Sequence, residues 1–118
     1  MPCPESFFRQ YLETALWSSM DNEGQYALDE SYYTDDIAPA TLAAMRADCD
    51  AFYDANQEII DRYDCETCGQ DFWLTRNRHG AGFWDGDYLK EDGRMLTEAS
   101  KAFGETWLYI GDDGLIYC

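Results

Sequence analysis

The sequence predicts an α+β fold: N-terminal helices packed on a small antiparallel sheet of two hairpins, with a helix between the hairpins. Three observations predict it. Two early segments carry apolar residues at helical spacing. Two later segments pair short aromatic-rich runs around turns that contain glycine. A further helical segment separates these hairpins, and this order is typical of helices covering an antiparallel sheet. The length of 118 residues fits a single domain, 1–118.

The first predicted helix covers residues 4–19. Pro4 is favourable in a first helical turn, and Phe8, Leu12 and Leu16 share one face. Residues 20–36 are polar and irregular, so we expect a loop there that is anchored by its aromatic side chains.

The second predicted helix, residues 38–63, is the longest in the chain. Pro39 lies at its start, and Asp35 and Asp36 favour the positive N-terminal end of the helix dipole. One face is apolar, with Asn56 as its only polar break. The apolar residues of this face are Leu42, Met45, Cys49, Phe52, Ile59 and Tyr63.

The first hairpin is predicted over residues 71–85, with strands at 71–76 and 82–85 and a glycine-containing loop between them. Its aromatic side chains are expected in the core together with that of a later tryptophan. These core candidates are Trp73, Phe83, Trp84 and Trp107.

A shorter helix is predicted over residues 92–103, and Gly104 stops it. Residues 107–110 and 115–117 then indicate a second hairpin around a turn at 111–114.

The charge of the chain excludes several classes of partner. Twenty-four acidic residues face eight basic ones, giving a net charge of −16, of which residues 1–64 carry −11. Nucleic acids and anionic membranes are repelled by such a surface. A basic protein is the partner class that the charge favours, although solubility or a salty habitat would also account for it.

The chain has no apolar run long enough to span a membrane and no signal-peptide pattern at its start. Its five cysteines are an odd number, which is typical of free thiols in a reducing compartment. We therefore expect a cytoplasmic protein. No cofactor is expected.

An acidic stripe is predicted on the second helix. Asp50, Asp54, Glu58 and Asp61 follow helical spacing opposite the apolar face, and Asp48 lies nearby. One interpretation is a row of anions that imitates nucleic-acid phosphates and binds a partner. The other is an ordinary solvated helix face.

Cys65 and Cys68 form a C-x-x-C motif. A zinc site needs a second pair of ligands, but His79 is the only histidine. A redox motif would follow a strand, whereas this one follows a predicted helix. A structural or incidental role is therefore favoured, and no metal site is expected.

A second candidate site groups Arg76, His79 and Asp85 on the first hairpin. A histidine near acids can act as a general acid or base. No motif supplies a nucleophile, however, and Asn, His and Gly are also ordinary turn residues.

Residues 71–85, DFWLTRNRHGAGFWD, resemble a segment of small acidic proteins from bacteriophages and prophages. The resemblance extends to residues 36–39 and 108–114. It implies a mobile-element origin and assigns no catalytic residue. By analogy of class, small acidic phage proteins are similar to inhibitors of host restriction or CRISPR systems.

The sequence therefore favours a phage-type, anti-CRISPR-like inhibitor that imitates DNA. Its expected partner is a basic host protein that belongs to a nucleic-acid-binding complex, without direct contact to nucleic acid or membrane. Asp48, Asp50, Asp54, Glu58 and Asp61 are the predicted partner-binding residues. A small enzyme built on Arg76, His79 and Asp85, or a module that stabilises a phage assembly, is the alternative.

Overall fold

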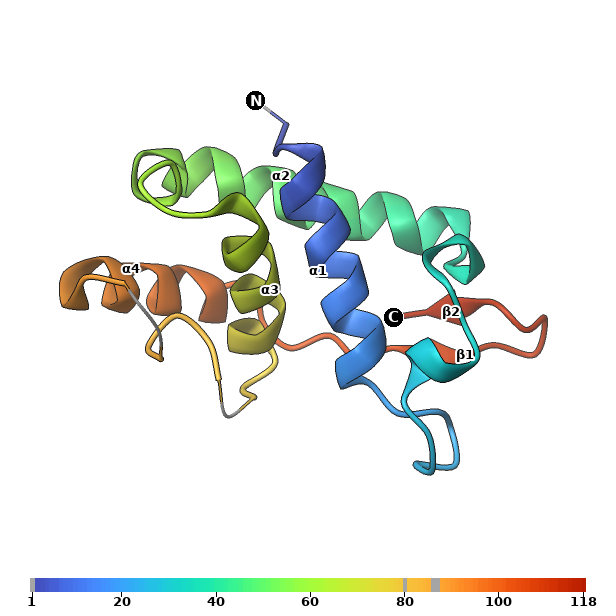
Figure 1. Ribbon diagram of the computed structural model, residues 1–118. Helices are drawn as coiled ribbons and strands as arrows, with labels where there is room; N and C mark the ends of the chain where they lie inside the picture. Colours follow the sequence, from blue (N-terminus) through green and yellow to red (C-terminus); the bar gives the residue numbers. More distant parts are fainter. Residues whose placement is uncertain (1, 80, 86–87) are drawn as a thin grey trace.

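The computed structural model describes residues 2–79, 81–85 and 88–118. Within these residues the fold is α+β, as predicted, but it is mostly helical (Figure 1). The α-helices are α1 (Glu5–Ser18), α2 (Pro39–Ile60), α3 (Cys65–Arg76) and α4 (Lys90–Lys101). Two 3₁₀ turns, η1 (Leu28–Glu30) and η2 (Thr34–Asp36), lie between α1 and α2. The strands β1 (Tyr109–Ile110) and β2 (Ile116–Tyr117) close the chain.

The arrangement of the helices centres on the pair α1 and α3. These helices lie side by side, the long α2 crosses them, and α4 lies on the far side of α3 (Figure 1). Gly69 of α3 makes the close approach possible, because a Cβ there would collide with the backbone carbonyl of Phe7 in α1. The strands β1 and β2 occupy the opposite end of the molecule from α4.

Aromatic side chains fill the core between α1, α2 and α3. Phe52 and Phe72 stack with ring centroids 4.0 Å apart. Trp73 packs edge-on against Tyr11 at 5.4 Å, and its indole N–H donates to the Ser18 hydroxyl over 2.8 Å. A buried indole with a satisfied N–H contributes a large apolar area without an orphaned donor.

A kink divides α2 at the predicted polar break. Asn56 has non-helical angles, φ −123° and ψ 17°, and its side-chain amide donates to the Phe52 carbonyl over 2.9 Å. The side chain thus occupies a carbonyl of the preceding turn, which is a recognised cause of helix bending.

The predicted hairpin over residues 71–85 is wrong. Residues 71–76 belong to α3, and Asp64 caps this helix by accepting the Thr67 N–H over 3.2 Å. Residues 82–85 form a turn rather than a strand, with the Phe83 N–H donating to the Thr75 hydroxyl over 3.1 Å. Gly80, in the predicted loop, lies outside the described residues.

Two of the four aromatic residues expected in the core are at the surface. Trp73 and Phe83 are buried, as expected, but Trp84 and Trp107 are 49 % and 51 % exposed. The aromatic content of a segment therefore does not establish burial of each ring.

The second predicted hairpin is present but short. Tyr109 pairs with Tyr117, and Ile110 with Ile116, in antiparallel register. Ile116 also forms a parallel bridge with Ile37, which ties the sheet to the segment that precedes α2.

Candidate functional site

An open groove of about 570 Å³ lies between the C-terminal half of α2 and α4. Three of its acids belong to the predicted stripe, namely Asp54, Glu58 and Asp61, and Asp92 of α4 adds a fourth. The kink at Asn56 contributes to its wall. The stripe acids that follow the middle of α2 therefore line a concave surface instead of a straight helix face.

The groove acids differ in their contacts. Asp54 and Glu58 are exposed. Asp61 accepts a hydrogen bond from the Tyr53 hydroxyl over 2.8 Å. Burial, reinforced by Asp61, raises the pKa of Tyr53 to about 12, so the phenol stays a neutral donor. Asp61 is thus held in place by the fold while it faces the groove.

Asp48 and Asp50 bind groups that lie outside the groove. Asp50 accepts the Cys3 N–H over 2.9 Å and the Arg46 guanidinium over 3.2 Å. Partial burial opposes ionisation of Asp50, but the Cys3 N–H and Arg46 outweigh it and lower its pKa. Asp48 accepts from Arg76 over 2.8 Å. Both carboxylates therefore stabilise the folded chain, and the groove acids are the part of the stripe that faces outward.

Arg62, the cation among the described residues that line the groove, is already engaged. Arg62 donates to both carboxylate oxygens of Asp92 over 3.0 and 3.2 Å, and the Tyr63 hydroxyl donates to the same carboxylate over 2.6 Å. Sequence reasoning missed Asp92, because no local pattern pairs residues 30 positions apart. The sequence signal that Asp92 does carry is its place in the first turn of α4, and an acid there indicates a favourable interaction with the helix dipole.

Arg76, His79 and Asp85 do not share a cavity among the described residues. Arg76 is 4 % exposed, and its guanidinium binds Tyr11 and Asp48 together with backbone carbonyls that follow α4. The ring centroid of His79 lies 5.9 Å from that of Trp107. The Nε2 atom of His79 is buried, and none of the described residues forms a hydrogen bond with it. Asp85 is exposed and lines a cavity beside α3 whose lining includes neither Arg76 nor His79.

Cys65 and Cys68 lie in the first turns of α3, a position that normally lowers a thiol pKa. Here burial and the carboxylates of Asp61 and Asp64 raise the pKa of Cys65. Burial also raises the pKa of Cys68 to about 12. Both thiols therefore remain protonated near neutral pH, which disfavours nucleophilic and metal-binding roles. In the ranges that the structure describes, no three metal-ligating side chains form a cluster.

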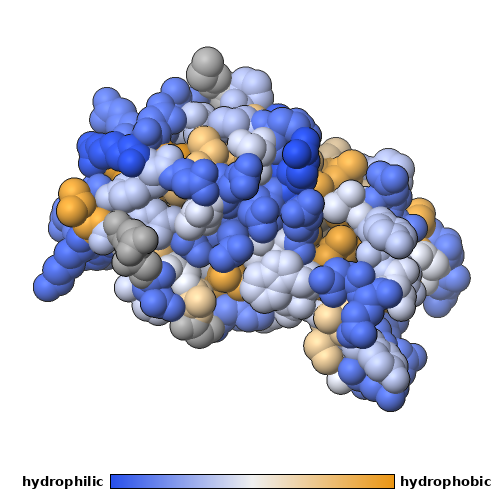
Figure 2. Space-filling view, in the orientation of Figure 1, coloured by the Kyte–Doolittle hydropathy of each residue, from blue (hydrophilic) through white to orange (hydrophobic). Residues whose placement is uncertain are grey.

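The face of the molecule seen in Figure 1 is mainly hydrophilic. Figure 2 shows its apolar residues in small separate areas. Large contiguous apolar patches mark hydrophobic interfaces. Several large aromatic side chains are nevertheless exposed among the described residues, among them Trp17, Tyr33 and Trp107, so aromatic contacts are available for recognition beside charge and hydrogen bonding. None of the described helices is both long and apolar enough to cross a membrane.

Comparisons with known proteins find no relative of the chain. No protein-family model matches the chain, and neither the search of curated proteins nor that of solved structures finds a match.

Proposed function

We propose that this protein is an acidic inhibitor of the phage type, which binds a basic, nucleic-acid-binding surface of a host protein through the groove between α2 and α4. The observation that carries the proposal is the groove itself. Asp54, Glu58 and Asp61 face it, and its arginine, Arg62, is paired with Asp92. The groove thus presents anions to a partner on a chain whose net charge is −16.

The strength of exposed ion pairs determines how tightly such a surface can bind a partner. One exposed pair contributes about 0–1 kcal/mol, so a single contact is not sufficient for tight binding. Several pairs in one groove add, and the net field of the chain increases the rate of encounter with a cationic surface. Association should therefore slow as salt rises, because the screening length falls to about 8 Å at physiological ionic strength.

The enzyme alternative has no comparable support. Arg76 is one of its three residues, and the guanidinium of Arg76 is occupied by internal partners. A catalytic group must reach its substrate, and this one is covered by the chain.

The test begins with capture of the partner from a bacterial lysate and its purification. Binding of that partner is then compared between the native chain and a D54K/E58K variant. Two attractive contacts become repulsive, so we expect the dissociation constant to rise about tenfold or more. Asp61 is left unchanged because it holds the Tyr53 hydroxyl.

The matched control is D35K/D112K, which makes the same change of charge at exposed positions near η2 and the β1–β2 turn. These positions lie at the opposite end of the molecule (Figure 1). The control variant should bind the partner nearly as tightly as the native chain does. In a separate experiment, DNA or RNA should compete with the native chain for the partner. Circular dichroism verifies that both variants fold. Equal weakening by both variants, or no competition by nucleic acid, would refute the groove as the binding site.

A further inference from the structure

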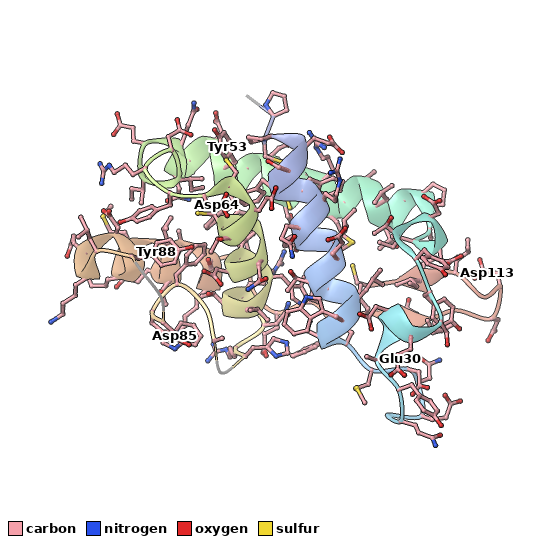
Figure 3. The ribbon with its side chains drawn as sticks, in the orientation of Figure 1. Glu30, Tyr53, Asp64, Asp85, Tyr88 and Asp113 are labelled. Atoms are coloured by element: carbon pink, nitrogen blue, oxygen red, sulfur yellow. The ribbon has the colours of Figure 1, made fainter. Side chains whose placement is uncertain are left out.

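A second cavity lies beside α3, away from the acidic groove. Its volume is about 320 Å³, at the lower end of the range of about 300–1,000 Å³ that is typical of small-ligand pockets. Tyr63 and Tyr88 form one part of its lining, with ring centroids 4.7 Å apart. Three carboxyl side chains, those of Asp64, Asp71 and Asp85, form another. Figure 3 shows Tyr88 between α3 and α4 and Asp85 on the nearby loop.

Asp71 is the unusual member of this lining. It is 6 % exposed, and the Tyr88 hydroxyl donates to its Oδ2 over 2.8 Å. Among the described residues, the ion pairs formed by arginine side chains do not include this carboxyl. A buried carboxylate without a cation is costly, so burial and the nearby Asp85 raise the pKa of Asp71.

The aromatic side chains are fixed by the fold. The Tyr63 hydroxyl donates to Asp92 over 2.6 Å and accepts the Leu89 N–H over 3.0 Å. Tyr88 is fixed by Asp71 and packs edge-on against Phe83 at 5.3 Å. The cavity is therefore preorganised, which reduces the cost of ordering side chains when a ligand binds.

The chemistry of the lining selects a particular ligand. Aromatic faces attract cations, and a buried carboxyl that forms no ion pair with a described residue provides the counter-charge. A guanidinium suits this combination better than an ammonium, because it is planar, weakly hydrated and has several donors in a fork. The exposed Asp85 can take a second branch of that fork.

We propose that the cavity lined by Tyr63, Asp71, Asp85 and Tyr88 binds a guanidinium group, with Asp71 as its principal counter-ion. The proposal concerns a separate site from the α2–α4 groove and does not depend on the identity of any protein partner. The guanidinium can belong to a small molecule or to an arginine side chain, and the two sources share the same chemistry.

The test is a titration of the full chain, followed by NMR or calorimetry, with two guanidinium probes. Methylguanidinium represents a free ligand, and N-acetylarginine methylamide represents a peptide-borne side chain. N-acetylcitrulline methylamide, which has nearly the same shape but no charge, is the neutral control. We expect saturable binding of at least one charged probe and at least about tenfold weaker binding of the citrulline analogue.

The matched variants are D71N and D112N. D71N keeps an acceptor for the Tyr88 hydroxyl but removes the charge, so the charged probe should bind about tenfold or more weakly. D112N makes the same change on an exposed turn and should leave probe binding unchanged. Y88F, which preserves the ring, is a second variant should D71N fail to fold, and it should weaken binding by disturbing Asp71.

The result for the two charged probes distinguishes the sources. Binding of both supports a site for the bare group, and binding of the arginine derivative alone supports a site for a side chain. Absence of saturable binding for both charged probes overturns the proposal, as does equal binding of the citrulline analogue or an unchanged affinity in D71N. None of these outcomes bears on the α2–α4 groove, whose test uses different variants.

Discussion

Replacement of Arg76 by methionine tests whether this arginine holds the fold together. Its guanidinium donates to the Tyr11 hydroxyl over 3.1 Å, to Asp48 over 2.8 Å, and to the carbonyls of Gly104 and Phe103 over 2.9 and 3.1 Å. Asp48 is 42 % exposed in its side chain, so that pair contributes only about 0–1 kcal/mol. The remaining acceptors lose a charged donor, which typically costs about 1–3 kcal/mol for each buried group.

Methionine retains much of the aliphatic volume over Phe72 and Phe103, so the R76M variant isolates the polar contacts. We expect a loss of about 3–5 kcal/mol, against a total stability of about 5–15 kcal/mol for a domain of this kind. Urea unfolding followed by circular dichroism measures it. At an m-value of about 1–3 kcal/mol per molar, the midpoint should fall by about 1–5 M.

The matched control for this prediction is R94M on α4. Arg94 pairs with Glu91 and Glu98 on the helix surface and is exposed, so its replacement should cost about 1 kcal/mol or less. An R76M protein whose free energy of unfolding lies within about 1 kcal/mol of the native value would refute the reasoning. It would show that water replaces the guanidinium without cost, and hence that the site is more open than the structure indicates.

Two further predictions concern tryptophan burial and acid stability. Trp73→Ala should cost about 3–5 kcal/mol, whereas Trp84→Ala should cost about 1 kcal/mol or less because its ring is half exposed; urea midpoints of the two variants check this. The lowered pKa of Asp50 means that its contribution to stability is complete above its unfolded pKa, near 4, and is lost as pH falls through the lower folded value. The difference in melting temperature between the native chain and D50N should accordingly be constant at pH 5–7 and shrink below about pH 4. A difference that did not change with acidity would contradict the assignment of the Cys3 and Arg46 contacts.

The helices α1, α2 and α4 were predictable because each has one buried face and one solvated face. Because of that asymmetry, apolar residues recur in the sequence with a period of about 3.6 residues. Leu96 of α4, for example, is buried while Glu98, two residues on, is exposed. The prolines at positions 4 and 39 added chemical signals for helix starts.

The helix α3 was not predictable in the same way, because neighbouring elements cover its second half on all sides. Every residue from 71 to 77 is buried, so its apolar pattern has no period. A short continuous run rich in aromatic and β-branched residues is equally compatible with a buried strand. The structure shows one local feature that marks the start of this helix, namely Asp64 at the N-cap, which accepts the Thr67 N–H.

The candidate groove was partly predictable. Helical spacing placed Asp54, Glu58 and Asp61 near one another, and the structure agrees that they line one surface. The same spacing grouped Asp50 with them, although its carboxylate is bound to the segment that precedes α1. Spacing along one helix specifies which residues share a face. Tertiary contacts decide which of those residues bind other groups of the same chain.

The kink at Asn56 has a consequence for the shape of any partner. A straight acidic helix would be a convex rod, suited to a channel that normally holds a nucleic-acid duplex. The kinked α2 instead presents its later acids in a hollow beside α4. A complementary partner therefore has to project basic side chains from a ridge, a loop or a helix end that enters this hollow. A search for partners should accordingly look for protruding cationic elements rather than for cationic channels.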